Sequence, residues 1–284
     1  MMLAPATREA ELAALARDFE PERYLAATLA GATARAALIA LAAYAADLQR
    51  ITATSTQPML GEIRLQWWRD TLEIFGKGGR TGSPVADALG AAVAAHALPL
   101  PMLAAMSEAR AWDLYDDPMP DQASLDGYLT KTEAIPFELA LRVLGVAADE
   151  AGALSVPAGR AFGMMRLLAR LAGHLAHGRI PLPLEMLAEH DLDRDRFLSD
   201  GADLALRALI TSQSDNIRAT LALLRPQMAA LSKQQRTALL PLALVHPYLR
   251  IIERSRHDAR RDIADVAPLT RVWRIGAAHL TGRI

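Results

Sequence analysis

The sequence predicts an all-α protein, and three observations support that fold class. Apolar residues recur at helical spacing along most of the chain, alternating runs of β-branched residues are missing, and Pro21 and Pro58 stand where helices are expected to begin. The chain has 284 residues, of which 52% are hydrophobic and 22% are charged. It is therefore long enough and apolar enough to form a substantial core.

The hydrophobic periodicity predicts helices at residues 8–18, 21–31, 33–53, 58–75, 85–97, 101–116, 123–144, 148–176, 203–226, 233–257 and 268–280. Between two of these helices, the stretch GKGGRTGSP at 76–84 has four glycines and a closing proline, which predict a surface loop. Because the same amphipathic pattern continues on both sides of this loop, we expect a single domain over residues 1–284.

The overall composition argues against several classes of protein. The formal net charge is −1, so the chain has no general attraction to nucleic acid, and it has no cysteine for disulfides or thiol chemistry. The N-terminal residues carry acids early and lack the apolar run of a signal peptide, which suits a cytoplasmic protein. The apolar segment 24–48 contains Arg35, so we expect a buried pair of helices there rather than a membrane span.

The stretch GEIRLQWWRDTLE at 61–73 contains two of the four tryptophans of the chain. Core packing of Trp67 and Trp68 is the ordinary expectation for such large aromatic side chains. The alternative is that the two rings form a wall of an apolar ligand cavity or a surface for a partner protein.

Two charged stretches have both a structural and a functional interpretation. In DLYDD at 113–117, Asp113 and Asp117 are four residues apart and could hold Mg²⁺ bridged to a diphosphate, although acids near prolines are more often a solvated loop. Residues 249–284 hold eight arginines and four acids. That pattern is typical of a solvated, ion-paired face, and the alternative is a contact with a membrane surface or a partner.

The stretch RLLARLAGHLAHGRIPLP at 166–183 places four basic side chains on one strip of a helix. Arg166, Arg170, His174 and His177 follow one another at spacings of four, four and three residues. Such a strip is either a solvated face or part of a cavity wall, and the residues alone leave both possibilities open.

Taken in order, four parts of the chain resemble the squalene/phytoene synthase family: RYLAATLAGATARAALIALAAYAADLQRI (23–51), PMLGEIRLQWWRDTLE (58–73), ARAWDLYDD followed by LDGYLTKTEA (109–134), and AGRAFGMMRLLARLAGHLAHGRIPLP (158–183). The resemblance implies a single all-α domain with the isoprenoid-synthase fold, a helical bundle around a central apolar cavity. It also implies that active members join two prenyl diphosphates head to head. They do so with two aspartate-rich helices that hold Mg²⁺ on the diphosphates.

The chain departs from the family at both aspartate-rich motifs. Counting forward from Arg35, the acids of the first motif would fall at positions that here hold Leu48, Gln49 and Thr52, and Asp47 is the nearby acid. Counting back from Arg179, the acids of the second motif would fall at positions that here hold Arg170, Gly173 and His174. Because a diphosphate leaves only when Mg²⁺ neutralises its charge, we expect no catalytic residue, no metal site and no cofactor.

GEIRLQWWRD and the missing acids together most resemble a divergent branch of this family, which includes a mitochondrial assembly factor for respiratory complex I and its bacterial relatives. That resemblance implies a non-catalytic assembly or binding factor. Its implied partners are respiratory-complex subunits, and its implied location is the cytoplasm or, as a peripheral protein, the inner face of the membrane.

Two other functions remain open from the sequence. One is a Mg²⁺-dependent prenyl diphosphate transferase with altered metal ligands, taken from Asp47, Asp113, Asp116 and Asp117. The other is a protein that binds an apolar isoprenoid or lipid in the inherited cavity without chemistry.

The candidate cavity-lining residues are Tyr44, Asp47, Trp67, Trp68, Asp113, Tyr128, Arg170, His174 and Arg179. Arg170 and His174 are expected either to pair with Asp47 or Asp113 across the cavity or to bind a phosphate or carboxylate directly.

Overall fold

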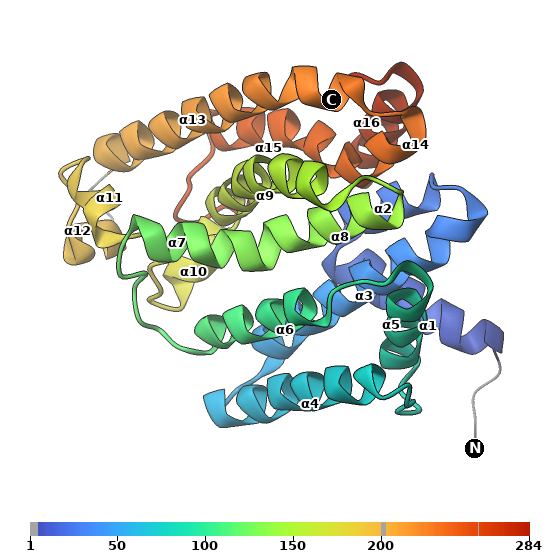
Figure 1. Ribbon diagram of the computed structural model, residues 1–284. Helices are drawn as coiled ribbons and strands as arrows, with labels where there is room; N and C mark the ends of the chain where they lie inside the picture. Colours follow the sequence, from blue (N-terminus) through green and yellow to red (C-terminus); the bar gives the residue numbers. More distant parts are fainter. Residues whose placement is uncertain (1–4, 200–202, 255) are drawn as a thin grey trace.

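A computed structural model describes residues 5–199, 203–254 and 256–284, and this part of the chain forms helices and turns without any strand (Figure 1). The elements are α1 (Pro5–Phe19), α2 (Pro21–Thr28), α3 (Ala32–Thr54), α4 (Pro58–Gly76), α5 (Pro84–His96), α6 (Leu100–Ala109), η1 (Arg110–Leu114), α7 (Gln122–Leu129), η2 (Thr130–Ala134), α8 (Ile135–Val143), α9 (Ala148–Ala169), α10 (Leu171–Ala176), α11 (Leu184–Ala188), α12 (Arg194–Leu198), α13 (Asp203–Ala230), α14 (Lys233–Arg236), η3 (Thr237–Leu244), α15 (Val245–Ile252) and α16 (Pro268–Thr281). The predicted all-α class is confirmed.

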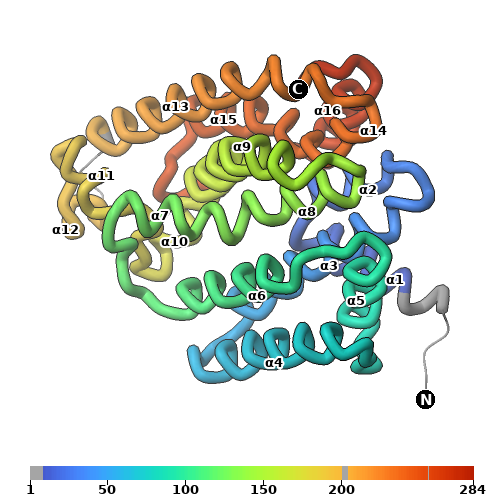
Figure 2. Tube along the Cα trace, in the orientation of Figure 1, coloured from blue at the N-terminus to red at the C-terminus, as the bar shows by residue number. Residues whose placement is uncertain are grey.

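Helix α3 lies in the middle of the N-terminal half and packs against α1, α2, α5 and α8. Its sequence is rich in alanine, and most of these alanines are buried, so neighbouring helices approach it closely on several sides. Figure 2 shows α3 beside α8, although the two are far apart in the sequence. The apolar segment 24–48 therefore forms a buried helix pair, as predicted, and no helix in the described residues is long and apolar enough to cross a membrane.

The loop between α4 and α5 does not separate two bodies. Helix α5 turns back and packs against α3, so the chain before and after the predicted loop at 76–84 contributes to one bundle. The C-terminal half adds α9, α13 and α15, which pack on one another above α8 in Figure 1.

A glycine brings α9 close to η2. A Cβ on Gly159 would lie 2.4 Å from the backbone nitrogen and Cα of Ala134, so no larger residue fits there without a shift of one helix. The contact holds η2, a turn of π-helix, against α9. This turn carries Glu133, whose side chain is buried.

Several helices predicted as continuous are interrupted in the structure. The predicted helix 123–144 contains the π turn η2 just before Pro136, and the predicted helix 233–257 becomes the 3₁₀ segment η3 around Pro241. Proline lacks the N–H that the regular α pattern requires, so the helix geometry changes near it. The predicted helix 148–176 is divided at Arg170, and the short helices α11 and α12 were not predicted.

Candidate functional site

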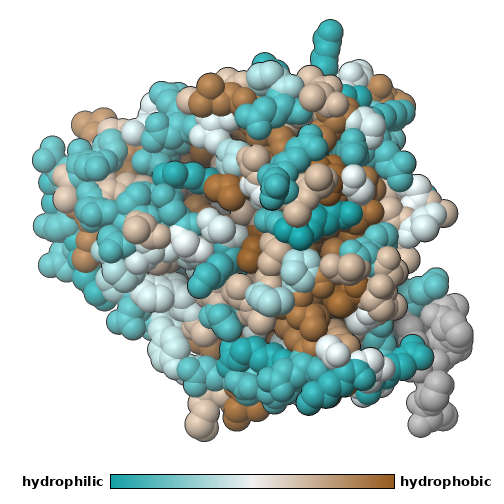
Figure 3. Space-filling view, viewed as in Figure 1, coloured by the Kyte–Doolittle hydropathy of each residue, from teal (hydrophilic) through white to brown (hydrophobic). Residues whose placement is uncertain are grey.

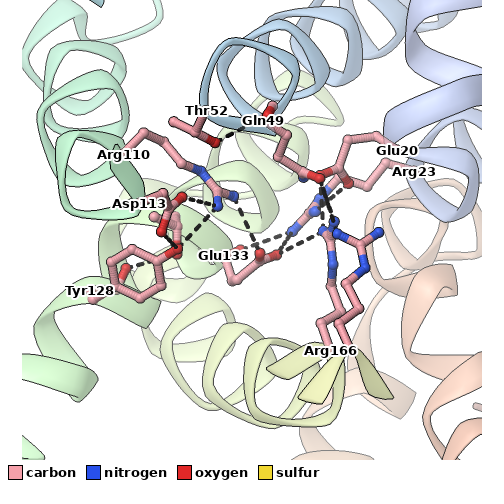
Figure 4. Close-up of polar contacts among 11 residues, drawn as sticks. Glu20, Arg23, Gln49, Thr52, Arg110, Asp113, Tyr128, Glu133 and Arg166 are labelled. Atoms are coloured by element: carbon pink, nitrogen blue, oxygen red, sulfur yellow. Dashed lines mark hydrogen bonds and ion pairs between the residues drawn. The ribbon is translucent and has the colours of Figure 1, made fainter. Parts of the chain in front are cut away.

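A network of buried charges connects four elements in the interior (Figure 4). Glu20 precedes α2 and is 0% exposed, yet it accepts from Arg23 at 2.6 Å, from Arg166 at 2.9 Å and from the side-chain amide of Gln49. Glu133 of η2 lies on the other side of the same two arginines, with oxygen Oε2 2.9 Å from Arg23 and 3.4 Å from Arg166. Each guanidinium group therefore bridges two carboxylates that come from distant parts of the chain.

The neighbouring arginines set the ionisation state of Glu20. Burial alone raises the pKa of Glu20, but the positive charges of Arg166 and Arg23 outweigh this effect and lower its pKa to about 2. Glu20 is therefore a carboxylate at neutral pH. The Arg23 and Arg166 guanidinium groups also lie over aromatic rings, with Arg23 4.9 Å from the ring centre of Phe137 and Arg166 5.6 Å from that of Phe162.

A second branch of the network joins Glu133 to η1 and α7. Arg110 lies 3.6 Å from Glu133 and 3.0 Å from Asp113, and it donates to the hydroxyl of Tyr128 at 3.1 Å. Tyr128 in turn donates to Asp113 at 2.7 Å. The complete network contains three carboxylates, Glu20, Asp113 and Glu133, and three guanidinium groups, Arg23, Arg110 and Arg166, so its charges balance within the protein.

The structure brings together the positions where the resemblance places the two metal-binding motifs. The Gln49 side-chain oxygen of α3 accepts from Arg166 at 2.9 Å and from Arg170, at the start of α10, at 3.5 Å. Leu48 is buried in the core, and the Thr52 hydroxyl donates to the backbone of Gln49. Gln49 and Arg170 therefore meet, with Arg166 beside them, where the resemblance implies carboxylates on both helices.

The expected ion pairs of Arg170 and His174 with Asp47 or Asp113 are not formed in the described residues, although the negative charge of Asp113 acts on His174 and opposes the effect of burial on its pKa. Asp47 instead accepts from Arg50 at 2.5 Å, and Asp113 accepts from Arg110, because these arginines are only three residues away in each case. Arg170 is exposed, and the neighbouring charge of Arg166 lowers its pKa. His174 is half-buried, and burial lowers its pKa, which favours the neutral ring.

Tyr44, Asp47 and Trp68 form a second buried polar group beside the network. The indole nitrogen of Trp68 donates to Asp47 at 2.9 Å, and the hydroxyl of Tyr44 donates to the backbone of Leu103 at 2.7 Å. The Trp68 ring is 0% exposed, as the sequence predicts for a core residue. Core packing is wrong for Trp67, which is 42% exposed on α4 and meets the Trp68 ring edge to face, with the ring centres 5.1 Å apart.

Three of the four carboxylates suggested as altered metal ligands have other partners. Asp47 and Asp113 are paired as described, and Asp116 accepts from Arg179 at 2.5 Å, while Arg179 also donates to the backbone of Asp113 at 3.1 Å. Within residues 5–199, 203–254 and 256–284, no three acidic or histidine side chains come close enough to hold one metal ion.

Two hollows are lined by none of the nine predicted cavity-lining residues. An apolar cavity of about 30 Å³ lies between α2, α3, α8 and η3, and its lining includes Ala27, Leu41 and Phe137. This volume is far below the roughly 300 Å³ that binds a small organic ligand. An open groove of about 360 Å³ runs along α4, lined by Ile63, Leu65 and Arg69 among others. In Figure 3, hydrophobic residues gather over the middle of the visible face, between hydrophilic rows that follow α8 and α4.

Most residues of the network were not predicted from the sequence, although the sequence contains one signal of it. Leu125, Leu129, Glu133 and Phe137 follow one another at a spacing of four residues, and the three apolar members are fully buried. An acid on the buried stripe of a predicted helix requires a partner of opposite charge. Glu20, Arg23 and Arg110 gave no comparable signal, because Glu133 and Arg166, the partners that join them into one network, are far away in the sequence.

Comparisons with known proteins agree with the fold. The sequence model of a family described as squalene/phytoene synthase matches residues 16–273. By structure, the chain is similar to a squalene synthase from Alicyclobacillus acidocaldarius (TM-score 0.76, 17% identity, 91% of this chain and 98% of that one). It is also similar to a dehydrosqualene synthase in complex with ligand (TM-score 0.80, 15% identity, 98% of each chain).

Similar curated sequences carry a different description. The human NADH dehydrogenase (ubiquinone) complex I, assembly factor 6 is 26% identical over 196 residues, which cover 69% of this chain and 59% of that protein. The mouse protein of the same name is 24% identical over 244 residues, which cover 86% of this chain and 73% of that protein. The alignment thus spans about three fifths of the length of the human relative.

Proposed function

This chain belongs to the squalene/phytoene synthase family, and we propose that it is a non-catalytic member that acts as an assembly factor for respiratory complex I. The observation that carries the proposal is the meeting of Gln49 with Arg166 and Arg170. In that place, a prenyl transferase of this family would need carboxylates to hold Mg²⁺. The similarity to the assembly factors of human and mouse supports the choice of partner.

The network of three carboxylates and three guanidinium groups supports a structural role for the place where a transferase of this family would bind its substrate, because the charges of the network already neutralise one another. The three arginines of the network already bind three carboxylates, so a diphosphate would have to break these ion pairs in order to bind. Removing one member of such a buried pair typically costs about 3–5 kcal/mol of stability. The network therefore holds α3, η2 and α9 together at the site where a transferase would need open space.

Helix α4 offers a surface for a protein partner. Met59 is 63% exposed, Ile63 60% and Trp67 42%, and their spacing of four residues places them on one side of the helix. The groove of about 360 Å³ lies beside them. Exposed apolar side chains that gather in this way favour a contact with another protein, here a complex I subunit or assembly intermediate.

The test is a deletion of the gene from its host, followed by native gels stained for NADH dehydrogenase activity. We expect less fully assembled complex I, restored by the wild-type gene but not by Trp67→Ser. Leu204→Ser is the matched control, because it also replaces an exposed apolar residue but lies on α13. Normal complex I in the deletion strain contradicts the assembly role.

A separate assay tests the non-catalytic part of the proposal. The purified protein is incubated with farnesyl diphosphate and Mg²⁺, and released diphosphate and hydrocarbon products are measured. We expect neither above background. Release of diphosphate together with a head-to-head product would favour the transferase with altered metal ligands.

A further inference from the structure

Helix α16 is apolar on two opposite sides. Its inner side, with Ile275 and Ala278, is buried against the rest of the bundle, where α16 contacts η3 and α2. Its outer side carries Leu269 (85% exposed), Trp273 (74%) and Leu280 (76%), at spacings of four and seven residues. These spacings place the three side chains on one stripe that points away from the core.

The stripe extends beyond these three side chains. Val272 is 54% exposed beside it, and Gly276 continues the line between Trp273 and Leu280 without adding a polar group. Single exposed apolar residues are common on soluble proteins, whereas a contiguous stripe marks an interaction surface. The helix has 14 residues and is therefore about 21 Å long, so the stripe can lie along a flat surface.

Exposed arginines lie on three helices of this part of the bundle, Arg225 on α13, Arg250 on α15 and Arg274 on α16. Burial and, after it, the positive charges of these three arginines and of Arg218 lower the pKa of His246. Arg218 is paired with Asp215 and Glu253. Arg225, Arg250 and Arg274 are exposed and have no acidic partner in the part of the chain that the structure describes.

The arginines and the stripe belong to the same region. Arg274 follows Trp273 directly on α16 and is also one of the arginines whose charge lowers the pKa of His246. Figure 1 shows α13, α15 and α16, which carry these residues, together in the upper part of the bundle, whereas α4 lies at the lower end. Acids near α16 do not cancel this charge, since Asp265 already accepts from Arg271 and Glu253 from Arg218.

We propose that this C-terminal face, formed by Leu269, Trp273, Leu280, Arg225, Arg250 and Arg274, binds the surface of an anionic lipid bilayer. Helix α16 lies parallel to the bilayer, its apolar stripe enters the boundary between headgroups and acyl chains, and the arginines contact lipid phosphates. Tryptophan prefers this boundary because its ring is apolar and its N–H is polar. The proposal does not depend on the assembly role and holds for any activity of the protein.

The test is flotation of the full-length protein with vesicles of phosphatidylcholine alone or mixed with about one third of phosphatidylglycerol, a composition that supplies negative surface charge. We expect binding to the anionic vesicles that is about tenfold stronger than to the neutral ones and that weakens at high salt. Leu269→Ser with Trp273→Ser removes the binding, and Arg225→Gln with Arg250→Gln and Arg274→Gln removes the preference for anionic lipid.

Leu204→Ser is the matched control, because Leu204 is also 85% exposed but lies at the start of α13. It binds vesicles like the wild type, and circular dichroism checks that all variants are folded. Absence of binding to either vesicle, or equal loss of binding in Leu204→Ser, overturns the proposal. A change of oligomeric state in Leu269→Ser with Trp273→Ser, without any vesicle binding by the wild type, would identify a protein-protein surface instead.

Discussion

Trp68 and Trp67 are neighbours in the sequence, but their surroundings differ. Trp68 is fully buried and donates to Asp47, whereas Trp67 is 42% exposed. We expect Trp68→Ala to lower the free energy of unfolding by about 3–5 kcal/mol, since it leaves a cavity and removes the donor to Oδ2 of Asp47. Trp67→Ala should cost only about 1 kcal/mol, because part of its surface is in water in the folded state. Urea unfolding of both variants checks the difference, and equal losses would contradict the assignment.

Glu20 makes the stability of the protein depend on pH. Its pKa is about 2 in the folded protein and ordinarily 4.5, because Arg166 and Arg23 stabilise the carboxylate. A lowered pKa contributes stability that is complete above pH 4.5 and is lost as the pH falls toward 2. We expect Glu20→Gln to lose about 3–5 kcal/mol at pH 7, where the native carboxylate pairs with two arginines.

The measurement is urea unfolding of the wild type and Glu20→Gln between pH 7 and pH 2.5. The difference between the two proteins should shrink as the pH falls below 4.5, since the wild-type carboxylate then loses its advantage over the unfolded state. A difference that is constant over this range would show that Glu20 does not titrate as described. Asp18→Asn, which changes an exposed acid on α1, is the control and should leave stability nearly unchanged.

At the scale of elements, the contact of α9 with η2 depends on Gly159. We expect Gly159→Ala to destabilise the protein by about 1–3 kcal/mol, because the new Cβ would overlap the backbone of Ala134. Gly152→Ala on the same helix is the matched control, since its nearest neighbour would be Glu138 at 3.9 Å. That variant should gain about 0.5–1 kcal/mol through helix propensity. Thermal unfolding compares the two, and a stabilising Gly159→Ala would contradict the packing.

At the scale of the whole molecule, we expect the protein not to bind Mg²⁺ at the junction of α3 and α10. Arg170→Asp with His174→Asp should raise Mg²⁺ affinity about tenfold, since two carboxylates replace a fixed cation and a neutral ring. Head-to-head condensation should still be absent, because α3 keeps Leu48, Gln49 and Thr52. Calorimetry measures Mg²⁺ binding with and without farnesyl diphosphate. Tight Mg²⁺-dependent binding of the diphosphate by the wild type would contradict this expectation.

The sequence determined the fold class and most helix positions of this protein, and its resemblance to one family indicated which positions lack metal-binding carboxylates. Helical periodicity is a local property, repeated within one turn, so α3, α4 and α13 follow from spacing alone. The irregular turns η2 and η3 were not predicted. A proline indicates that a regular α-helix is disturbed near it, but it does not indicate which kind of irregular turn forms there.

Only the tertiary structure decided which charges meet. Arg23 reaches Glu133 over 110 residues, and Arg166 reaches Glu20 over 146, whereas Asp47 and Asp113 pair with arginines three residues away. Sequence spacing fixes which side chains share a helix face, but it does not fix which faces of different helices come within 4 Å of one another. The packing of α3, η2 and α9 sets those distances, and an ion pair forms only where the packing allows it.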